Sequence, residues 1–296
     1  MRDAPSLGEM IDEVAARFRV SDLYYGHGYD NPWDEAVALV LGVGEFPDDK
    51  SVLSQPLADV LRRRITRLAT RRIEERIPLV YLLGKANFAG FEFLMEPGVV
   101  IPRSPIGQLI VNRFEPWLST IPRNIVDVGC GCGCIGIACA FKFPGVEVLL
   151  IDDDPGAVEL ARRNVALHEL GDRVEVLHSD LFASAGDSMF DLVISNPPYV
   201  DSVDMGSLPS EYRHEPESGL AAGDDGLEVV DRLLTELPGR LASLGTFVCE
   251  VGGSAPALLR KYPQLPFIWP DLPQGGAGVF LLHASDFAQT GARSSA

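Results

Sequence analysis

Four consecutive residues, Asn196-Pro197-Pro198-Tyr199, have groups suited to holding a planar amide or amine. Two prolines stiffen the backbone after the asparagine, because proline fixes φ and lacks an N–H. The amide oxygen of Asn196 can accept one N–H of an incoming NH₂ group, and the Pro197 carbonyl can accept the other. Tyr199 can lay its ring on the flat substrate. The alternative is a Pro-Pro turn that merely ends a strand, since short motifs often occur by chance.

A glycine-rich loop lies upstream, in the run Asp127-Val128-Gly129-Cys130-Gly131-Cys132-Gly133. Glycines let the backbone turn sharply and approach a ligand closely, where a Cβ would collide. Asp152 ends the next predicted strand, where a carboxylate can receive the two hydroxyls of a ribose. Asp180 follows the third strand and can meet an adenine amino group. Each acid alone can simply cap the next helix, but three acids and a glycine loop at successive strand ends converge on one ligand.

The charge of Asp127 indicates which adenosine ligand this is. A pyrophosphate ligand calls for G-x-G-x-x-G, whereas this loop reads G-x-G-x-G behind an aspartate. A carboxylate is unfavourable near a pyrophosphate and favourable near an ammonium or sulfonium group. S-adenosylmethionine carries both cations, so we expect it as the cofactor and S-adenosylhomocysteine as its product. The expected cofactor contacts are Asp127, Gly129, Gly131, Gly133, Asp152, Asp180 and Asn196.

Strands and helices alternate from about residue 105 onward, which predicts the elements that position these residues. Expected strands cover residues 125–128, 146–151, 174–177, 192–195, 246–251 and 278–282, and expected helices cover 135–141, 157–170 and 226–237. This pattern predicts an α/β fold with a mostly parallel, Rossmann-like sheet covered on both faces. Ligands in such sheets bind at the carboxyl ends of the strands.

The segment before residue 85 has helical spacing of its apolar residues and predicts a small helical bundle. Residues 88–101 partly alternate, with Pro97-Gly98 as a turn signal, which predicts a β-hairpin between domains. We therefore expect a helical domain at 1–84, a hairpin linker at 85–104, the sheet domain at 105–288 and a disordered tail at 289–296.

Composition limits the class of protein and its partners. The protein has 296 residues, 46% of them hydrophobic, with no apolar stretch of membrane-spanning length and no signal-peptide core at its start. We therefore expect a cytoplasmic protein without membrane contact. The net charge of −17 repels phosphate backbones and attracts basic partners.

One basic run departs from this acidity. Residues 61–76 contain seven arginines, Arg62, Arg63, Arg64, Arg67, Arg71, Arg72 and Arg76, against two glutamates. The run is either a solvated helix face or a contact with RNA on a larger particle.

Four of the five cysteines, Cys130, Cys132, Cys134 and Cys139, lie within ten residues. Their alternation with glycine lacks the C-x₂-C spacing of metal sites, and no second ligand pair follows, so small buried thiols beside a tight loop are favoured over a metal site.

The sequence contains the glycine-rich loop, the acids at the strand ends and Asn-Pro-Pro-Tyr in the same order as the class I methyltransferases, which it therefore resembles. More narrowly, it resembles the protein-(glutamine-N5) methyltransferases. Within that family the sequence resembles the branch that modifies ribosomal protein L three of the large subunit. The residues that carry this choice are Tyr25-Gly26-His27-Gly28, Asp30-Asn31-Pro32-Trp33-Asp34-Glu35-Ala36, Ile101-Pro102-Arg103-Ser104-Pro105 and Glu211-Tyr212-Arg213-His214-Glu215-Pro216-Glu217. The release-factor branch usually has a Pro-Arg-Pro-Glu-Thr-Glu-like stretch where this sequence has Pro102-Arg103-Ser104-Pro105.

The resemblance implies transfer of a methyl group from S-adenosylmethionine to a glutamine side-chain nitrogen. It implies catalytic roles for Asn196, Pro197 and Tyr199, with Pro198 among the substrate-binding residues. It also implies a basic ribosomal protein as substrate, recognised by the helical domain. Relatives commonly have Thr and Ser where this sequence has Cys130 and Cys132, which are poorer hydrogen-bond donors, so a contact to the cofactor carboxylate is weakened.

Three alternatives stay open at this point. A release-factor glutamine methyltransferase shares the motifs. Adenine-N6 and cytosine-N4 methyltransferases of nucleic acids have similar Asn/Asp-Pro-Pro-aromatic strand ends, but they must flip a base and bind phosphates, which the acidic composition argues against. A methyltransferase fold that serves as an assembly factor is the non-enzymatic alternative.

Overall fold

The computed structural model describes residues 4–291, which divide into two compact units. Unit 1 combines the N-terminal residues up to Ala86 with the short pieces Met95–Pro97 and Pro209–His214. Unit 2 holds Asn87–Leu94, Gly98–Leu208 and the residues from Glu215 onward.

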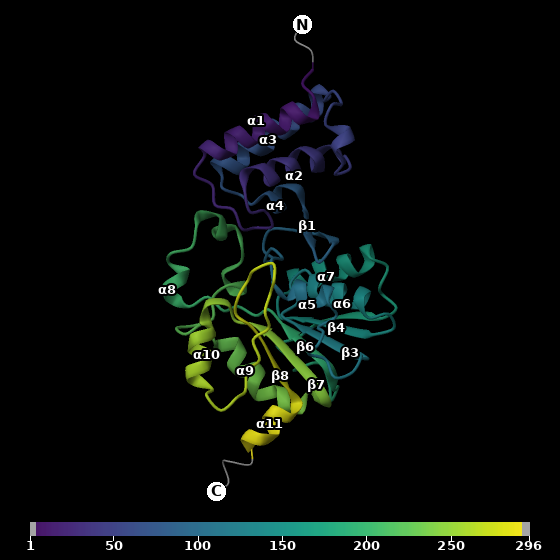
Figure 1. The fold of residues 1–296 in the computed structure, drawn as a ribbon, viewed down its shortest axis with the longest axis vertical. Coiled ribbons are helices and arrows are strands. Elements are labelled where there is room, and N and C mark those ends of the chain that lie inside the picture. Colours follow the sequence, from purple (N-terminus) through teal and green to yellow (C-terminus); the bar gives the residue numbers. More distant parts are fainter. Residues whose placement is uncertain (1–3, 292–296) are drawn as a thin grey trace. The chain divides into compact units, whose positions relative to one another are not determined.

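Unit 1 is helical (Figure 1) and contains α1 (Leu7–Val20), α2 (Pro32–Gly44), η1 (Lys50–Val52), α3 (Asp59–Glu74) and α4 (Leu79–Leu83). Ser6 caps α1 in a capping box with Glu9, and Asn31 caps α2. The helices bury one apolar core, which includes Leu7, Met10, Ile11, Val14, Phe18, Leu39, Val40, Ile65, Leu68 and Leu79. The spacing of apolar residues had predicted three helices; the short α4 was not foreseen.

A buried ion network adds to this core. The guanidinium of Arg72, on α3, donates to the carboxylates of Glu35, on α2, and Glu211, in the piece Pro209–His214. All three side chains are 2% exposed. Arg72 also donates to the backbone carbonyl of Tyr24. Glu35 and Glu211 lie in two of the motifs that indicated the family branch, so the fold brings these motifs together.

The predicted hairpin exists, but its turn lies elsewhere. Strands β1 (Lys85–Phe88) and β2 (Phe91–Leu94) form a two-stranded sheet. Ala89 and Gly90 connect them with φ of 50° and 89°, as a tight two-residue hairpin turn requires. Pro97 and Gly98 do form a turn, with a φ of 95° at Gly98, but it is not the turn of the hairpin. Residues 99–101 form no strand after it, and the Ile101 N–H donates to the Glu215 carboxylate instead.

Unit 2 is built on a six-stranded sheet with the order β5-β4-β3-β6-β7-β8. Its strands are β3 (Asn124–Val128), β4 (Glu147–Asp152), β5 (Val174–His178), β6 (Phe190–Ser195), β7 (Leu241–Glu250) and β8 (Val279–His283). All neighbouring pairs are parallel except β7 with β8. The mostly parallel sheet predicted from the sequence is therefore confirmed.

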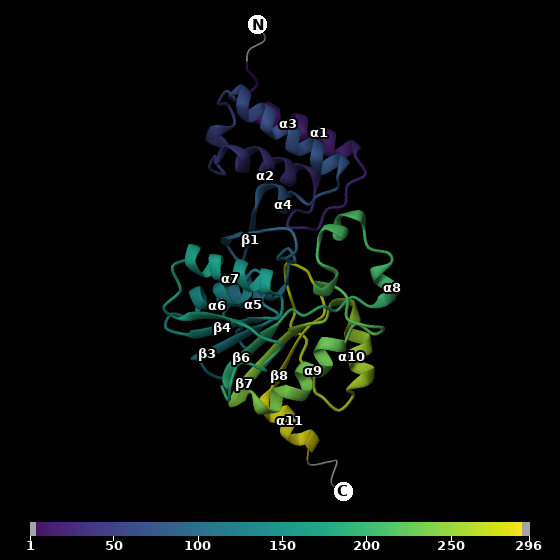
Figure 2. The same ribbon diagram turned by 180° about the vertical axis from the view of Figure 1, so that it is seen from behind.

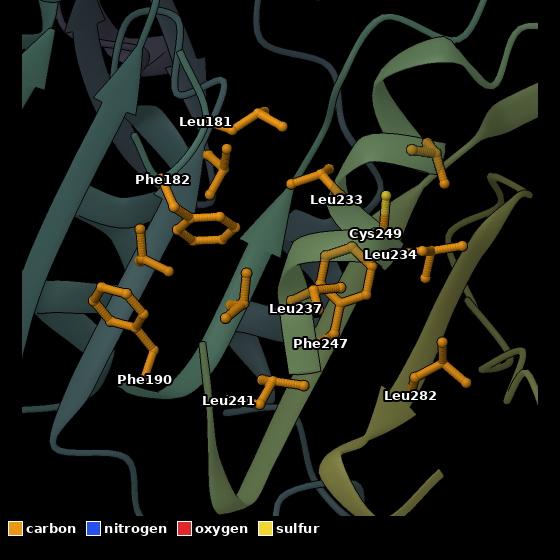
Figure 3. Close-up of a cluster of buried hydrophobic side chains, with 14 of the residues drawn as sticks. Leu181, Phe182, Phe190, Leu233, Leu234, Leu237, Leu241, Phe247, Cys249 and Leu282 are labelled. Atoms are coloured by element: carbon orange, nitrogen blue, oxygen red, sulfur yellow. The ribbon is translucent and has the colours of Figure 1, made fainter. Parts of the chain in front are cut away.

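Helices cover both faces of this sheet in the two views (Figures 1 and 2). They are α5 (Ile106–Val111), α6 (Cys134–Lys142) and α7 (Pro155–Leu167) on one face, and α9 (Glu228–Glu236), α10 (Ala255–Lys261) and α11 (Ala284–Gly291) on the other. Figure 3 shows part of the second layer, where Leu233 and Leu234 of α9 pack with Phe190, Phe247 and Leu282 of the strands. Short elements α8 (Ser202–Met205), η2 (Ser210–His214), η3 (Glu217–Gly219), η4 (Leu237–Gly239) and η5 (Gly252–Ser254) lie in the connections.

The predicted tail, 289–296, begins inside α11, which continues to Gly291; residues 292–296 lie outside the described part. Within residues 4–291, none of the helices combines the length and the apolar character that crossing a membrane requires.

Candidate active site

The strand order places β3 and β6 at the point where the direction of the chain across the sheet reverses. The backbone runs from β3 outward to β4 and β5 and then returns to β6 on the other side of β3, so these two strands lie at the topological switch point of the sheet. Val128 pairs with Ser195, and the Ser195 hydroxyl donates to the Val128 carbonyl at 2.7 Å. The glycine loop after β3 and the Asn196 motif after β6 therefore leave the sheet side by side.

Two hydrogen-bond acceptors of the Asn196 motif are unused. The Asn196 Oδ1 atom is buried and accepts no hydrogen bond from the described residues. Within the same range no donor reaches the carbonyl of Pro197, which is itself a buried residue. A buried acceptor without a donor costs about 1–3 kcal/mol, so such atoms are retained where a ligand completes them. Both acceptors of the predicted fork thus have no donor within residues 4–291, and their use by a substrate amide stays a prediction.

Tyr199 is held in place by Glu250 and Gly252, which were not predicted from the sequence. Its hydroxyl donates to Glu250 Oε1 at 2.8 Å, and the Ser104 hydroxyl donates to Oε2 at 2.6 Å. Its ring lies against Gly252, where an added Cβ would stand 2.5 Å from Tyr199 Cε2. Burial raises the pKa of Glu250, and the bonds from Ser104 and Tyr199 oppose this. Glu250 is the last residue of β7. Its position at a strand end, like that of Asp152, is the sequence signal that could have indicated it.

The backbone after the motif is anchored as well. The Ser254 hydroxyl donates to the Tyr199 carbonyl at 2.9 Å. Val200 then pairs with the segment at Leu220 and Ala222 through bonds of 2.8 and 3.0 Å. Pro198 is partly exposed. The motif is thus a rigid strand end, as its two prolines had indicated.

The glycine loop is bound to the neighbouring strand β4. The amides of Gly129 and Cys130 both donate to the Ile151 carbonyl, and the Gly131 amide donates to Asp152 Oδ2 at 2.8 Å. Gly129 has a φ of 70°, and a Cβ added there would meet no atom within 4 Å. The loop therefore exposes bare backbone to open space. Gly133, with a φ of 81°, is the N-cap residue of α6, and a Cβ there would stand 3.0 Å from Leu150 Cδ1.

Asp127 is a fully buried carboxylate with one free oxygen. Its Oδ2 accepts the Gly136 amide at 2.9 Å, whereas its Oδ1 has no partner among the described residues. Desolvation by burial raises the pKa of Asp127 to about 7. A cation beside Oδ1 would favour the charged form and lower this pKa again.

The other two predicted acids differ in their surroundings. Asp152 is 9% exposed, and burial raises its pKa. Its Oδ2 accepts a hydrogen bond from the Gly131 amide, and its Oδ1 accepts one from the Asp154 amide at 3.0 Å. Asp180 is exposed, and both its oxygens accept Nη2 of Arg232, at 2.7 and 2.8 Å. The fold thus brings Asp152 to the glycine loop. The role of Asp180 at an adenine stays a prediction, and this ion pair competes with it.

The cysteines of the loop are buried thiols. Burial raises the pKa of Cys130 well above its usual value, so the thiol stays protonated. Asn164, a buried residue of α7, donates to the Cys132 carbonyl at 2.9 Å and exchanges two hydrogen bonds with the Leu94 backbone. Asn164 was not predicted from the sequence. A polar residue at a position of the predicted helix that faces the core would have indicated it.

The residues present fit S-adenosylmethionine. Asp127 supplies an uncompensated carboxylate oxygen for a cation, Gly129 leaves space for close approach, and Asp152 stands at the end of β4 beside the loop. Each carboxylate oxygen of Asp152 accepts one amide and has a second lone pair for a hydroxyl.

Comparison with known proteins decides the family. A ribosomal protein uL3 glutamine methyltransferase of Francisella tularensis is 41% identical over 276 residues, which cover 92% of the present sequence and 87% of that protein. The chain belongs to the ribosomal protein uL3 glutamine methyltransferase family. The protein of that name from Xanthomonas campestris is 38% identical, and the match covers 98% of this methyltransferase and 96% of the relative. The resemblance to the L three branch is thereby confirmed, since uL3 is that protein.

Two further matches concern the sheet domain of this methyltransferase. The model of the methyltransferase small domain matches residues 107–208, from α5 through the Asn196 motif. The solved catalytic domain of hMettl16, in complex with the MAT2A 3'UTR hairpin 6, has a TM-score of 0.53 at 18% identity, and the match covers 83% of this protein and 91% of that one. At this identity the likeness shows the fold, a class I methyltransferase sheet.

Proposed function

We propose that this methyltransferase transfers a methyl group from S-adenosylmethionine to the side-chain amide nitrogen, N5, of a glutamine in ribosomal protein uL3. The observation that carries the proposal is the pair of unused acceptors, Asn196 Oδ1 and the Pro197 carbonyl, at the strand end beside the glycine loop. A primary amide has two N–H groups, which match these two acceptors. The names of the curated relatives support uL3 as the substrate.

The fork solves the main difficulty of the reaction. An amide nitrogen is a poor nucleophile, because its lone pair is delocalised into the carbonyl. Asn196 and the Pro197 carbonyl hold both hydrogens, direct the lone pair toward the methyl donor and stabilise the positive charge that grows on nitrogen. Tyr199 packs on one face of the amide, with its hydroxyl fixed by Glu250. The methyl–sulfur bond would break as the C–N bond forms, and one proton of the nitrogen would then pass to water, so no strong base is needed before attack.

The cofactor site in this proposal consists of the glycine loop with Asp127 and Asp152. S-adenosylmethionine supplies a methyl group activated by a sulfonium charge. Asp127 balances the positive charge of the cofactor, and Asp152 accepts hydrogen bonds from the ribose hydroxyls. Gly129 and Gly131 have no side chain, so the cofactor can lie close to the backbone there. Gly133 is the N-cap residue of α6 at the end of the loop, and Asp180 meets the adenine if it leaves Arg232.

The partners follow from charge. A net charge of −17 favours a basic ribosomal protein, which the helical unit 1 recognises, and speaks against DNA as substrate. The exposed arginines of the run Arg62–Arg76 contact RNA of the assembling large subunit, whereas Arg72 is buried. A ribosomal substrate supports a cytoplasmic location for the enzyme.

The test is methylation of purified uL3 with a radiolabelled methyl donor, followed by mass spectrometry. We expect one label per uL3 molecule, on a glutamine side chain, and no label when uL3 is replaced by DNA or RNA. The Asn196→Ala variant serves as the inactive control. Label on a release factor but not on uL3 would assign the enzyme to the release-factor branch, and label in nucleic acid would overturn the proposal.

A further inference from the structure

Helix α3 has a basic groove that the proposed glutamine chemistry does not use. A cavity of about 460 Å³ opens on this helix, lined by Arg62, Arg63, Thr66, Arg67, Thr70 and Arg71. All four arginines are exposed. Within residues 4–291 no carboxylate lines this groove, although acidic residues outnumber basic ones by 42 to 25 in the whole sequence.

The fold divides the seven arginines of the run into groups with different roles. Arg72 points into the core of unit 1 and is neutralised by Glu35 and Glu211. Arg76 also faces Glu211, at 3.4 Å. The opposite face of α3, with Ile65 and Leu68, packs into the core, which leaves the groove arginines facing solvent.

The groove arginines are available to a ligand. Arg63 and Arg67 form no ion pair with any residue in the range 4–291. Arg71 pairs with Glu75 at 2.9 Å and Arg62 approaches Asp59 at 3.6 Å. Both pairs are solvent-exposed, and pairs of this kind are weak and screened by salt, so an anion can displace them.

The spacing suits a row of anions. Arg63, Arg67 and Arg71 recur every four residues, which places them about 6 Å apart along one side of the helix. This is close to the separation of successive phosphates in an extended nucleic-acid strand. Thr66 and Thr70 stand between them with hydroxyls that can also bind phosphate oxygens. Arg17 of α1 donates to the Thr70 hydroxyl at 2.8 Å and adds a fifth cation beside the groove.

We infer that this groove binds the sugar–phosphate backbone of RNA. Arg63 and Arg67 are the central contacts, Arg62 and Arg71 flank them, and Arg72 and Arg76 take no part. Contacts to phosphates carry no sequence information, so this binding is independent of sequence. The inference rests on the proposed function only for the source of the RNA, which is the ribosomal RNA that accompanies uL3.

The test is binding of the full-length enzyme to a short fluorescent RNA hairpin, without methyl donor, over a range of about 50 to 200 mM salt. The wild type should bind with an affinity that falls steeply with salt, with a log–log slope of about −3 to −4 for four phosphate contacts at roughly −0.7 (single strand) to −0.9 (duplex) each. The variant Arg63→Glu/Arg67→Glu should lose at least about tenfold in affinity and have a shallower slope. Arg63→Gln/Arg67→Gln should lose less, in the same direction.

The matched control is Arg19→Glu/Arg260→Glu, which changes the net charge equally at two exposed arginines outside the groove. It should bind RNA as the wild type does. Equal losses in control and groove variant, or unchanged binding in the groove variant, would overturn the inference. So would a wild type that ignores the RNA hairpin and binds an acidic peptide probe instead.

Methylation of RNA-free uL3 separates this inference from the proposed function. Loss of RNA binding with unchanged methylation of free uL3 supports both. If the enzyme binds RNA through the groove but never methylates uL3, the inference about the groove would hold and the proposed substrate would be refuted.

Discussion

The Tyr199 hydroxyl donates a 2.8 Å hydrogen bond to Glu250, a carboxylate at the end of the neighbouring strand β7. Two adjacent strand ends are thus linked at the point where the proposed amide substrate is held. Because Ser104 binds the other oxygen of Glu250, the carboxylate is fixed on both sides, and with it the tyrosine ring. Glu250 is in this sense a positioning residue for Tyr199.

Removing this bond should impair use of the protein substrate. We expect Tyr199→Phe to lower kcat/KM for uL3 by about tenfold, since a lost hydrogen bond to a buried charge is worth about 1.5–3 kcal/mol and the ring remains. Cofactor affinity, measured by calorimetry, should stay unchanged. Gly252→Ala should act in the same direction, because a Cβ there displaces the ring. Weaker cofactor binding with unaltered kcat in either variant would speak against this role.

Asn196→Ala should abolish methyl transfer while leaving cofactor affinity within about tenfold. The physical reason is that the alanine lacks the acceptor that orients the amide, whereas the glycine loop and Asp152 remain intact. Single-turnover methylation and calorimetry on the same preparation provide the two measurements. The predicted role would be refuted by normal turnover.

Cofactor affinity should depend on the ionisation of Asp127. With its pKa near 7 in the free protein, the carboxyl is mostly protonated at pH 5.5 and must lose its proton to balance a cation. Affinity should therefore rise from pH 5.5 through about 7 and then level off. In Asp127→Asn this rise should disappear, and affinity should be lower at pH 7.5. A wild-type affinity independent of pH would exclude the contact.

Raising the pH should lower the contribution of the same Asp127 carboxyl to folding stability, whereas it should raise cofactor affinity. Its pKa is raised on folding from 3.8, so its contribution to stability is fully present below about pH 4 and is lost as pH rises through about 7. Asp127→Asn should therefore stabilise the ligand-free protein more at pH 8 than at pH 5, which urea unfolding at both values would reveal. An equal difference at both values would contradict the burial of this charge.

Arg72→Leu should strongly destabilise the protein. It leaves the carboxylates of Glu35 and Glu211 buried without their cation, a loss of about 3–5 kcal/mol at neutral pH. The deficit should shrink in acid, where these carboxyls are protonated. The control is Arg71→Leu, the next residue, whose exposed pair with Glu75 adds little, so its urea midpoint should stay near the wild-type value. Similar midpoints for both variants would contradict the prediction.

Local patterns in the sequence predicted most helices and strands, and the resemblance of the motifs to a known family indicated the reaction. Apolar periodicity located the sheet strands and most helices, because a strand or helix must bury one side of its own residues. Asn196, Asp127 and Asp152 could be found because each lies at a strand end, and strand ends meet the ligand in this class of sheet.

The tertiary structure decided which residues meet. The pairing of Val128 with Ser195, which sets the Asn196 fork beside the glycine loop, depends on strand order, and strand order is not encoded within any local window. For the same reason Glu250 and Asn164, far from their partners along the sequence, escaped notice. Arg71 and Arg72 are adjacent and alike in sequence, yet one faces solvent and the other the core, since only packing decides which side of a helix is buried.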